Sequence, residues 1–344
     1  MIRISSLFLV MLLSGASLWA RNTNKEKPQK VIVAYVTSWT QALPDTRYVT
    51  HINYAFGHVT ETFDGVRIDN PQRLKTVAAL KADNKDLKVL LSIGGWGSGR
   101  FSEMAADDQN RKKFAGDCAR VVKEYDLDGI DIDWEYPTSK AGGISASEDD
   151  TKNFTLLMED IRKAIGNKKL LTLATVMSGK YIDFAAIKDL VDFVNIMAYD
   201  SGNPPKHHAA LHRSEMTGSG SGEEGVKAHH AAGMPMDKLV LGIPFYGRGN
   251  NKDIKGFVHY RDLIKLTDFE TKWDAVAQVP YLVNAAGEMV CTYESPESIK
   301  IKAAFINANN LRGAMYWEYA GDTDDGLLSR TVFEEVITKA PRNR

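Results

Sequence analysis

Short apolar segments rich in β-branched residues recur along the chain, and segments with helical periodicity lie between most of them. In residues 71–84 and 148–167, apolar residues return every three or four positions, which indicates amphipathic helices. Eight strands that alternate with helices are typical of a (β/α)8 TIM barrel, and we therefore predict this α/β fold. The predicted strands begin at Val31, His51, Lys88, Gly129, Leu170, Phe193, Leu239 and Gly313.

We expect one domain over residues 28–340, because barrels of this class run as single domains beyond about 250 residues. The longest interval between strands, residues 247–313, holds a helix-like piece and an extended piece, so we predict a small α+β insertion at about 249–292, between strands seven and eight. The Gly- and Ser-rich residues 217–225 are predicted to form a flexible surface loop. A doubly wound open sheet is the alternative fold, but no Gly-rich phosphate-binding loop follows the first strand.

The first twenty residues have the layout of a secretory signal peptide, with one basic residue near the start, an apolar run from Leu7 to Leu13 and small residues approaching Ala20. We therefore expect residues 1–20 to be removed and the protein to be periplasmic or extracellular, with no membrane attachment afterwards. An uncleaved N-terminal anchor is the alternative. The 344 residues include 43 basic and 44 acidic ones, so nothing indicates nucleic acid as a partner.

Cysteines and histidines follow no metal-site spacing. Only Cys118 and Cys291 occur, and Cys118 lies in a helical stretch where a buried, unreactive thiol is expected. The adjacent histidines at 207–208 and 229–230 would point apart on a helix, and we expect them on surface loops. We therefore predict no metal.

Residues 128–137, DGIDIDWEYP, place three acids at every second position of a predicted strand. Alternate side chains of an extended chain share one face, so the carboxyls of Asp131, Asp133 and Glu135 lie together, with next-but-one Cα atoms ~6.5 Å apart. Active sites of barrels form at the C-terminal ends of strands, which places Glu135 nearest the mouth and Asp131 deepest. Because buried carboxylates are costly unless paired or protonated, we predict that Asp131 and Asp133 share a proton as a hydrogen-bonded pair, with Glu135 held protonated above them.

A protonated Glu in an enclosed site can act as a general acid, and protonation of a glycosidic oxygen suits it. Most glycosidases need a second carboxylate, roughly 5 Å or more than about 6.5 Å away across the bond. Asp133 lies one pleat behind Glu135, so it is better placed to orient a group on the substrate. Two alternatives are a solvated face of an edge strand, which a barrel interior does not offer, and a calcium loop, which needs turn residues around a central Gly.

Aromatic residues fall within or at the end of most predicted strands. Aromatic faces pack against the C–H faces of sugar rings, although most barrel aromatics belong to the core. Trp96, Tyr199 and Trp317 end strands beside Gly or Asp and are the candidates for sugar contacts. Gly94 and Gly95, which precede Trp96, permit the close approach of backbone or substrate.

Four motifs, in order along the chain, resemble those of glycoside hydrolase family 18, the chitinases and endo-β-N-acetylglucosaminidases. DGIDIDWE is similar to the family's D-x-x-D-x-D-x-E motif, LLSIGGW to its S-x-G-G motif, NIMAYD to its M-x-Y-D motif and GAMYWEYAGD to its last strand. HINYAF and IPFYGR resemble strands two and seven, so the resemblance runs from about Val31 to Asp322. The matching residues are Asp128, Asp131, Asp133 and Glu135; Ser92, Gly94 and Gly95; Met197, Tyr199 and Asp200; and Phe56, Arg248 and Trp317.

The resemblance implies a secreted hydrolase that cleaves β-1,4-linked N-acetylglucosamine oligomers with retention of configuration, through attack by the substrate's own 2-acetamido oxygen and an oxazolinium intermediate. It implies Glu135 as the acid and then the base, Asp133 as the partner of the acetamido N–H, and Asp131 as the residue that shares its proton. Tyr199 would donate to the acetamido carbonyl. The other expected sugar contacts are Phe56, Gly95, Trp96, Met197, Asp200, Arg248 and Trp317, and the expected structural residues of the motifs are Asp128, Ser92 and Gly94.

The same resemblance places Trp317 on the floor of the subsite for the reacting sugar and implies that no cofactor is needed. The small insertion implies a shallow cleft, hence endo-acting or short-oligomer activity, and the residues after Asp200 lack the aromatic often found there. One alternative is an endo-β-N-acetylglucosaminidase acting on N-glycan cores. Another is a non-catalytic chitin-binding lectin, which the presence of Glu135 and Asp133 disfavours. We expect a monomer.

Overall fold

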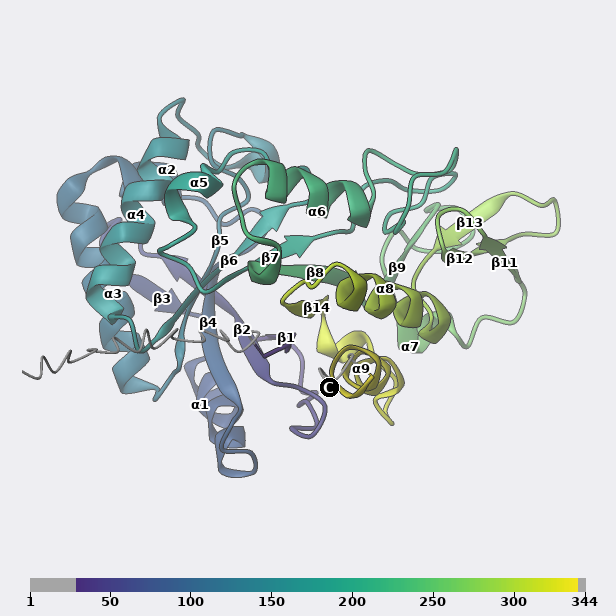
Figure 1. Cartoon of the computed structure of the whole chain (residues 1–344), viewed down its shortest axis with the longest axis horizontal. Coiled ribbons are helices and arrows are strands. Elements are labelled where there is room, and N and C mark those ends of the chain that lie inside the picture. Colours follow the sequence, from purple (N-terminus) through teal and green to yellow (C-terminus); the bar gives the residue numbers. More distant parts are fainter. Residues whose placement is uncertain (1–28, 340–344) are drawn as a thin grey trace, which may run out of the picture.

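The computed structural model describes residues 29–339, which form a closed barrel of parallel strands surrounded by helices (Figure 1). Each barrel strand pairs with the next one along the chain, and β1 closes the barrel against β14, which confirms the predicted (β/α)8 fold. A short strand, β3 (Val66–Ile68), adds antiparallel to β2. The predicted signal peptide lies outside the described residues. The barrel strands are β1 (Val31–Thr37), β2 (His51–Val59), β4 (Lys88–Gly94), β5 (Gly129–Asp133), β6 (Leu170–Val176), β7 (Phe193–Met197), β8 (Leu239–Pro244) and β14 (Gly313–Trp317).

The helices cover the outside of the barrel, and both segments with helical periodicity fold as predicted, into α1 and α4. Side-chain caps mark several of their starts: the Asp107 side chain accepts from the Asn110 N–H at the start of α3, and the Ser295 side chain accepts from Ser298 N–H at the start of α8. The helices around the barrel are α1 (Pro71–Ala79), α2 (Phe101–Ala106), α3 (Asp108–Glu124), α4 (Asp150–Ile165), α5 (Phe184–Ile187), α6 (Gly222–Ala231), α8 (Pro296–Ala308) and α9 (Leu327–Phe333).

Alternate residues of each barrel strand belong to two different cores. In β1, Val33 and Tyr35 point into the barrel, whereas Ile32 and Ala34 pack outwards into the larger core that also contains residues of the helices. All residues of β1 are buried, because the strand is covered on both faces. This double burial explains why the strands are visible in the sequence as continuous apolar runs.

A second, antiparallel sheet forms the predicted α+β insertion, which projects on the right of Figure 1. The chain leaves the barrel when β8 ends at Pro244 and enters this sheet at Tyr246, slightly before the predicted start. The tip of the insertion contains β11 and β12, and β13 returns the chain to α8. Its elements are β9 (Tyr246–Gly249), β10 (Val258–His259), α7 (Tyr260–Leu263), β11 (Glu270–Asp274), β12 (Val279–Val283) and β13 (Met289–Thr292).

Residues 217–225 are not the flexible surface loop that their Gly and Ser content predicts. Ser221 and Glu224 form a capping box at the start of α6, in which the Glu224 carboxylate accepts from the Ser221 N–H at 3.0 Å. Ser221 is only 1% exposed. The prediction was wrong because the Ser-x-x-Glu spacing, which starts a helix, outweighs the flexibility of the glycines.

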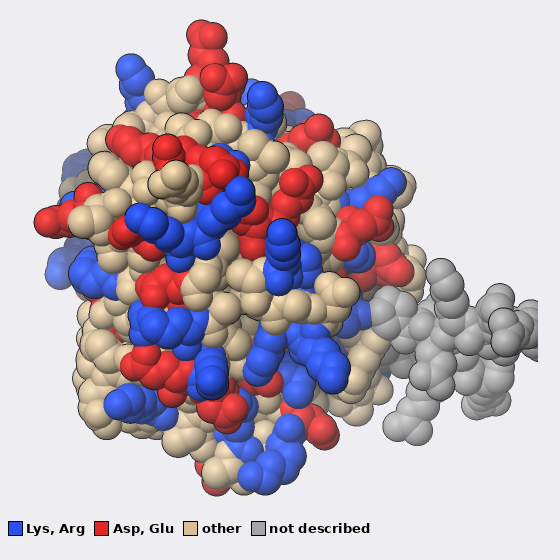
Figure 2. Space-filling model, turned by 90° about the vertical axis from the view of Figure 1, so that its left-hand side faces the viewer, with Lys and Arg blue, Asp and Glu red and all other residues tan. Residues whose placement is uncertain are grey.

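Charges of both signs are interspersed on the face that contains α3 and α4 (Figure 2). Several form ion pairs along one helix, such as Arg120 with Asp117 and Glu124. Within residues 29–339, none of the helices is both long enough and apolar enough to cross a membrane.

Candidate active site

The acid row of β5 faces the barrel interior and its mouth, as the sequence predicts. Asp131 and Asp133 are buried, and Glu135 lines the cleft at the C-terminal ends of the strands. The intervening Ile130 and Ile132 pack outwards with the helices. The pleat of one strand therefore presents carboxyls to the site and apolar side chains to the core.

Four donors surround the deepest carboxylate. Asp131 Oδ2 accepts from the hydroxyls of Tyr35 and Ser92, each at 2.8 Å. Asp131 Oδ1 accepts from the hydroxyl of Thr172 at 2.5 Å and from the Asn195 amide at 3.3 Å. Burial raises the pKa of Asp131, and these four hydrogen bonds oppose that rise. Charge on Asp131 is thus stabilised by neutral donors from four different strands.

Asp133 has no such partners. Its Oδ1 is buried without a hydrogen-bond partner, and no hydrogen bond joins it to Asp131 among the described residues. The predicted hydrogen-bonded pair of Asp131 and Asp133 is therefore not present in this conformation, because Tyr35, Ser92, Thr172 and Asn195 already occupy the Asp131 oxygens. Burial, followed by the charges of Glu135 and Asp131, raises the pKa of Asp133 well above its ordinary value. Asp133 thus has a buried polar atom available for a substrate group.

Glu135 has the properties of a general acid. Burial raises the pKa of Glu135 to about 7, and the negative charge of Asp200 acts in the same direction. Desolvation is the largest cause of this rise, and a hydrogen bond with Tyr136 opposes it. A carboxyl with this pKa is largely protonated under mildly acidic conditions.

The end of β7 contributes Met197, Tyr199 and Asp200, all of which line the cleft. The Tyr199 hydroxyl lies 3.8 Å from Met315 Sδ, and burial raises its pKa well above the ordinary value, so it remains a donor. Although burial opposes it, contacts with His208 and Arg248 hold the pKa of Asp200 below its usual range. Tyr199 can therefore donate a proton in a hydrogen bond, while Asp200 is a fixed anion.

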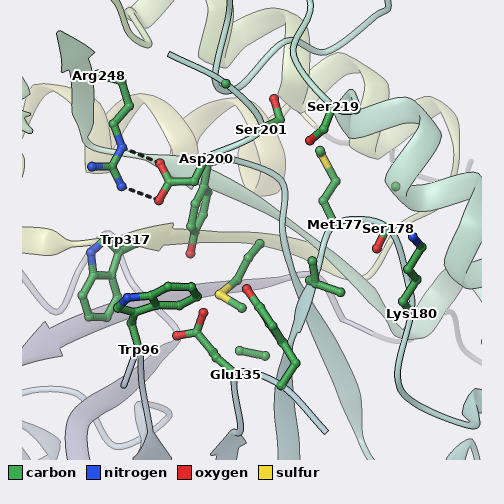
Figure 3. A pocket seen from close by; sticks show the side chains of 18 of the residues that line it. Trp96, Glu135, Met177, Ser178, Lys180, Asp200, Ser201, Ser219, Arg248 and Trp317 are labelled. Carbon is green, nitrogen blue, oxygen red and sulfur yellow. Dashed lines mark hydrogen bonds and ion pairs between the residues drawn. The ribbon is translucent and has the colours of Figure 1, made fainter. Parts of the chain in front are cut away.

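Arg248 lies on β9 of the insertion and forms a two-point ion pair with Asp200 (Figure 3). Its guanidinium also lies 5.2 Å from the centre of the Tyr246 ring. Asp200 and Arg248 are both predicted to contact the sugar, and both line the cleft. The insertion thus contributes one wall of the site.

Aromatic rings also line the cleft. Phe56 and Trp317 stack with their ring centres 5.6 Å apart and their planes at 20°. Trp39 lies 6.4 Å from Trp317 and is 60% exposed, while Trp96 is 66% exposed. Large exposed aromatics beside a cleft are unusual in a water-soluble fold and suit contact with sugar rings.

The paired glycines of β4 are required by their close surroundings. A Cβ at Gly94, which has φ +131°, would lie 2.0 Å from the backbone oxygen of Asp133. A Cβ at Gly95, which has φ +92°, would lie 2.6 Å from the Phe56 ring. The absence of a side chain at Gly94 therefore lets β4 lie close to the backbone of Asp133, and the absence of one at Gly95 lets the Phe56 ring lie close to β4.

Asp128 and Ser92 are placed as structural residues of the motifs. Asp128 Oδ2 accepts from the Val89 N–H at 2.9 Å and lies just before β5, at the end of the strand away from the mouth. Ser92 binds Asp131 directly, as described above. Neither residue lines the cleft.

Three of the four paired histidines are buried, so their predicted surface location is wrong. His207 Nε2 lies 3.1 Å from Asp274 of β11, and His208 Nδ1 lies 3.4 Å from Asp200. His229 is enclosed on α6. His229 has the Thr175 hydroxyl at 2.7 Å and the Gly225 backbone oxygen at 2.8 Å, whereas neither ring nitrogen of His208 has a hydrogen-bond partner among the described residues. The partner of His207 lies 67 residues away in the chain, and the sequence does not reveal such a partner. In the part of the chain that the structure describes, no group of three or more His, Cys, Asp or Glu side chains could hold a metal ion.

Several residues that line the cleft were not predicted from the sequence. Tyr136 and Tyr181 stack with ring centres 5.7 Å apart, and Phe257 projects from the insertion. Tyr136 directly follows Glu135, so it was accessible to sequence reasoning. Tyr181 and Phe257 lie in connections without a recognisable pattern. Together these residues enclose a cleft of about 1140 Å³.

Comparisons with known proteins agree with this geometry. The family model "Glycosyl hydrolases family 18" matches residues 31–322. Chitinase A1 of Niallia circulans is 33% identical over 320 residues, which cover 78% of this chain and 46% of that protein, so the chain spans less than half the length of this relative. A glycoside hydrolase family 18 N-acetylglucosaminidase from Paenibacillus barengoltzii has a similar structure, with a TM-score of 0.82, 32% identity, and coverage of 89% of this chain and 100% of that chain. The Ostrinia furnacalis Group IV chitinase in complex with allosamidin has a TM-score of 0.79 and 26% identity, with coverage of 91% and 98%.

Proposed function

Because the chain belongs to family 18 of the glycosyl hydrolases, we propose that it cleaves β-1,4-linked N-acetylglucosamine oligomers with the substrate's 2-acetamido group as the nucleophile. One observation carries this proposal: among the described residues that line the cleft, no carboxylate is available to attack from the far side of the sugar. Asp200 is paired with Arg248, and Glu224 is paired with Arg213. Asp133 lies behind the acid on the same strand.

Each step of the proposed hydrolysis can be assigned to a residue of the cleft. Glu135 gives its proton to the glycosidic oxygen as the C–O bond breaks, while the acetamido oxygen forms a bond to the anomeric carbon. Asp133 accepts from the acetamido N–H and balances the positive charge of the oxazolinium ion, and Tyr199 donates to the acetamido oxygen. Glu135 then takes a proton from the water that opens the ring. Two displacements at one carbon retain its configuration.

The position of the reacting sugar follows from the aromatic side of the cleft. Trp317 lies on the same side of the cleft as Trp96 and near Glu135 (Figure 3), and the Phe56 ring stacks on the Trp317 ring. An N-acetylated sugar over Trp317 would direct its anomeric carbon towards Glu135. Its acetamido group would then lie near Asp133 and Tyr199, which also line the cleft.

We further propose that the protein acts as an exported monomer. The support for export is the signal-peptide layout of residues 1–20. N-terminal sequencing of protein recovered from the periplasm or medium would give a chain that begins near residue 21. A full-length chain that stays with the membrane would contradict export, and an elution volume for a dimer in size-exclusion chromatography would contradict the monomer.

The function is tested by incubating the protein with chitohexaose and, in parallel, with a high-mannose glycoprotein. We expect shorter N-acetylglucosamine oligomers from the first and an intact glycan on the second. Release of the glycan would instead favour the endoglycosidase that cuts N-glycan cores. Glu135→Gln should lower turnover of chitohexaose by at least about 100-fold and retain binding, whereas Glu159→Gln on the exposed face of α4 should not. Binding of chitohexaose without products from the wild type would indicate a lectin.

A further inference from the structure

The two ends of the cleft differ in chemistry. Trp96 and Trp317 lie on one side of Glu135, whereas Met177, Ser178 and Lys180 lie on the other (Figure 3). Apart from Tyr136 and Tyr181, this second end is lined mainly by small, hydroxyl-bearing and charged residues. The end beside Trp317 therefore offers exposed indole rings, while the opposite end adds hydroxyls and a charge to the stacked rings of Tyr136 and Tyr181.

The loop that carries Lys180 is held on both sides. The Gly179 N–H donates to the Val176 oxygen at 3.0 Å, which makes a tight turn after β6. On the other side, the backbone oxygen of Tyr181 accepts a hydrogen bond from the Thr151 hydroxyl at 2.9 Å, and the Tyr181 ring stacks on the Tyr136 ring. The backbone at Lys180 thus has a defined position at the rim of the cleft.

The charges at this end do not cancel. Arg213 binds both oxygens of Glu224, with N–O distances of 2.5 and 2.8 Å, and Glu224 also accepts from the Ser221 N–H. Within residues 29–339, no acidic side chain forms an ion pair with the Lys180 ammonium. Lys180 is exposed, and the Ser178 and Ser219 hydroxyls line the same end of the cleft. This end therefore has one positive charge without an acidic partner in the described part of the chain, and two hydroxyls line the same end.

We propose that Lys180 is a specificity-determining residue that binds an acidic substituent on the leaving sugar, so that the preferred substrates carry a carboxylate on an N-acetylated amino sugar at this end. The inference rests on the proposed function, which makes Glu135 the boundary between the reacting sugar over Trp317 and the leaving group on the other side. A neutral oligomer would leave the Lys180 charge paired only with water. A carboxylate at this position would gain an ion pair and hydrogen bonds from the hydroxyls.

The test uses two chitotetraose derivatives that differ only in the charge of the modified reducing end: the aldonic acid and the neutral alditol. Both are offered to the enzyme in one reaction, and mass spectrometry follows the fragments that carry the modified unit. The ratio of their rates equals the ratio of kcat/KM. For the wild type at low ionic strength, we expect a preference of about threefold for the acid, as an exposed ion pair would give.

Variants distinguish the effect of the Lys180 charge on this ratio from the effect of the other charges of the protein. Lys180→Gln should bring the ratio to about one, and Lys180→Glu should reverse it; about 0.5 M salt should abolish the wild-type preference. Lys163→Gln, which removes an exposed charge on α4 that does not line the cleft, should leave the ratio as in the wild type. Equal rates for the two substrates in the wild type, or a preference that survives Lys180→Gln, would overturn the inference while hydrolysis itself stands. If neither substrate is cleaved, the proposed function fails as well.

Discussion

The guanidinium of Arg248 joins the carboxylate of Asp200 across two different sheets, with Nε–Oδ1 and Nη2–Oδ2 distances of 2.7 and 2.6 Å. Asp200 follows barrel strand β7, whereas Arg248 lies on β9 of the insertion. The pair fixes the insertion against the mouth of the barrel. It also offsets the negative charge of Asp200, which contributes to the raised pKa of Glu135.

The pH dependence of the wild type should report Glu135. A general acid is active in its protonated form, so kcat/KM for chitotetraose should fall as the pH rises through about 7, the pKa to which burial raises this carboxyl. Initial rates from pH 4 to 9, measured by chromatography of the products, test this. A fall in kcat/KM centred near pH 4.5, the ordinary pKa of a glutamate, would show that the pKa of Glu135 is not raised or that Glu135 is not the acid.

In Arg248→Met, the fall of kcat/KM with rising pH should occur at a higher pH than in the wild type. The variant leaves the Asp200 charge uncompensated near Glu135, which disfavours ionisation of Glu135 and raises its pKa by up to about one unit. The maximal kcat/KM should also fall, because the proposed contact of Arg248 with the sugar is lost. Arg47→Met, which removes an exposed arginine paired with Asp45 away from the cleft, is the control and should leave the profile unchanged. A fall of kcat/KM at a lower pH in Arg248→Met than in the wild type would contradict the claim that the Asp200 charge raises the pKa of Glu135.

Thr172→Val tests the donors around Asp131. The substitution keeps the shape of the side chain but removes the hydroxyl that donates to the buried carboxylate. Loss of a hydrogen bond to this buried carboxyl should lower the free energy of unfolding by about 1–3 kcal/mol. Thr172→Ser retains the hydroxyl and should lower the free energy of unfolding by less. Urea denaturation measures both variants, and a Thr172→Val variant as stable as the wild type would mean that this bond does not stabilise the fold.

Gly94→Ala should be far more destabilising than Gly143→Ala, although both glycines have positive φ. A Cβ at Gly143, which has φ +74°, meets nothing within 4 Å, so only backbone strain of about 1 kcal/mol is expected. A Cβ at Gly94 would lie 2.0 Å from the Asp133 backbone oxygen, and we expect a loss above about 3 kcal/mol together with lower kcat. Equal unfolding free energies for the two variants would show that β4 can move away from β5.

The parts of the fold that the sequence predicts are those governed by local pattern. All eight strands follow from continuous apolar runs, and the alternation that points Asp131 and Glu135 to one side follows from the period of two in an extended chain. The prediction for residues 217–225 failed although its Ser-x-x-Glu signal is local, whereas the other failures depend on tertiary partners. The burial of His208 depends on Asp200 and Tyr246, and the donors to Asp131 come from four strands that only the closed barrel brings together.

The central claim, that the substrate's acetamido oxygen is the nucleophile, is tested most directly by fluorinating that group. A series of chitobiosides with acetamido, fluoroacetamido, difluoroacetamido and trifluoroacetamido groups on the reacting sugar makes the carbonyl oxygen progressively less nucleophilic. If this oxygen attacks the anomeric carbon, kcat/KM should fall steadily along the series, and NMR of the first product should show the retained β configuration. A kcat/KM that is insensitive to fluorination, or a first product with the α configuration, would contradict the account.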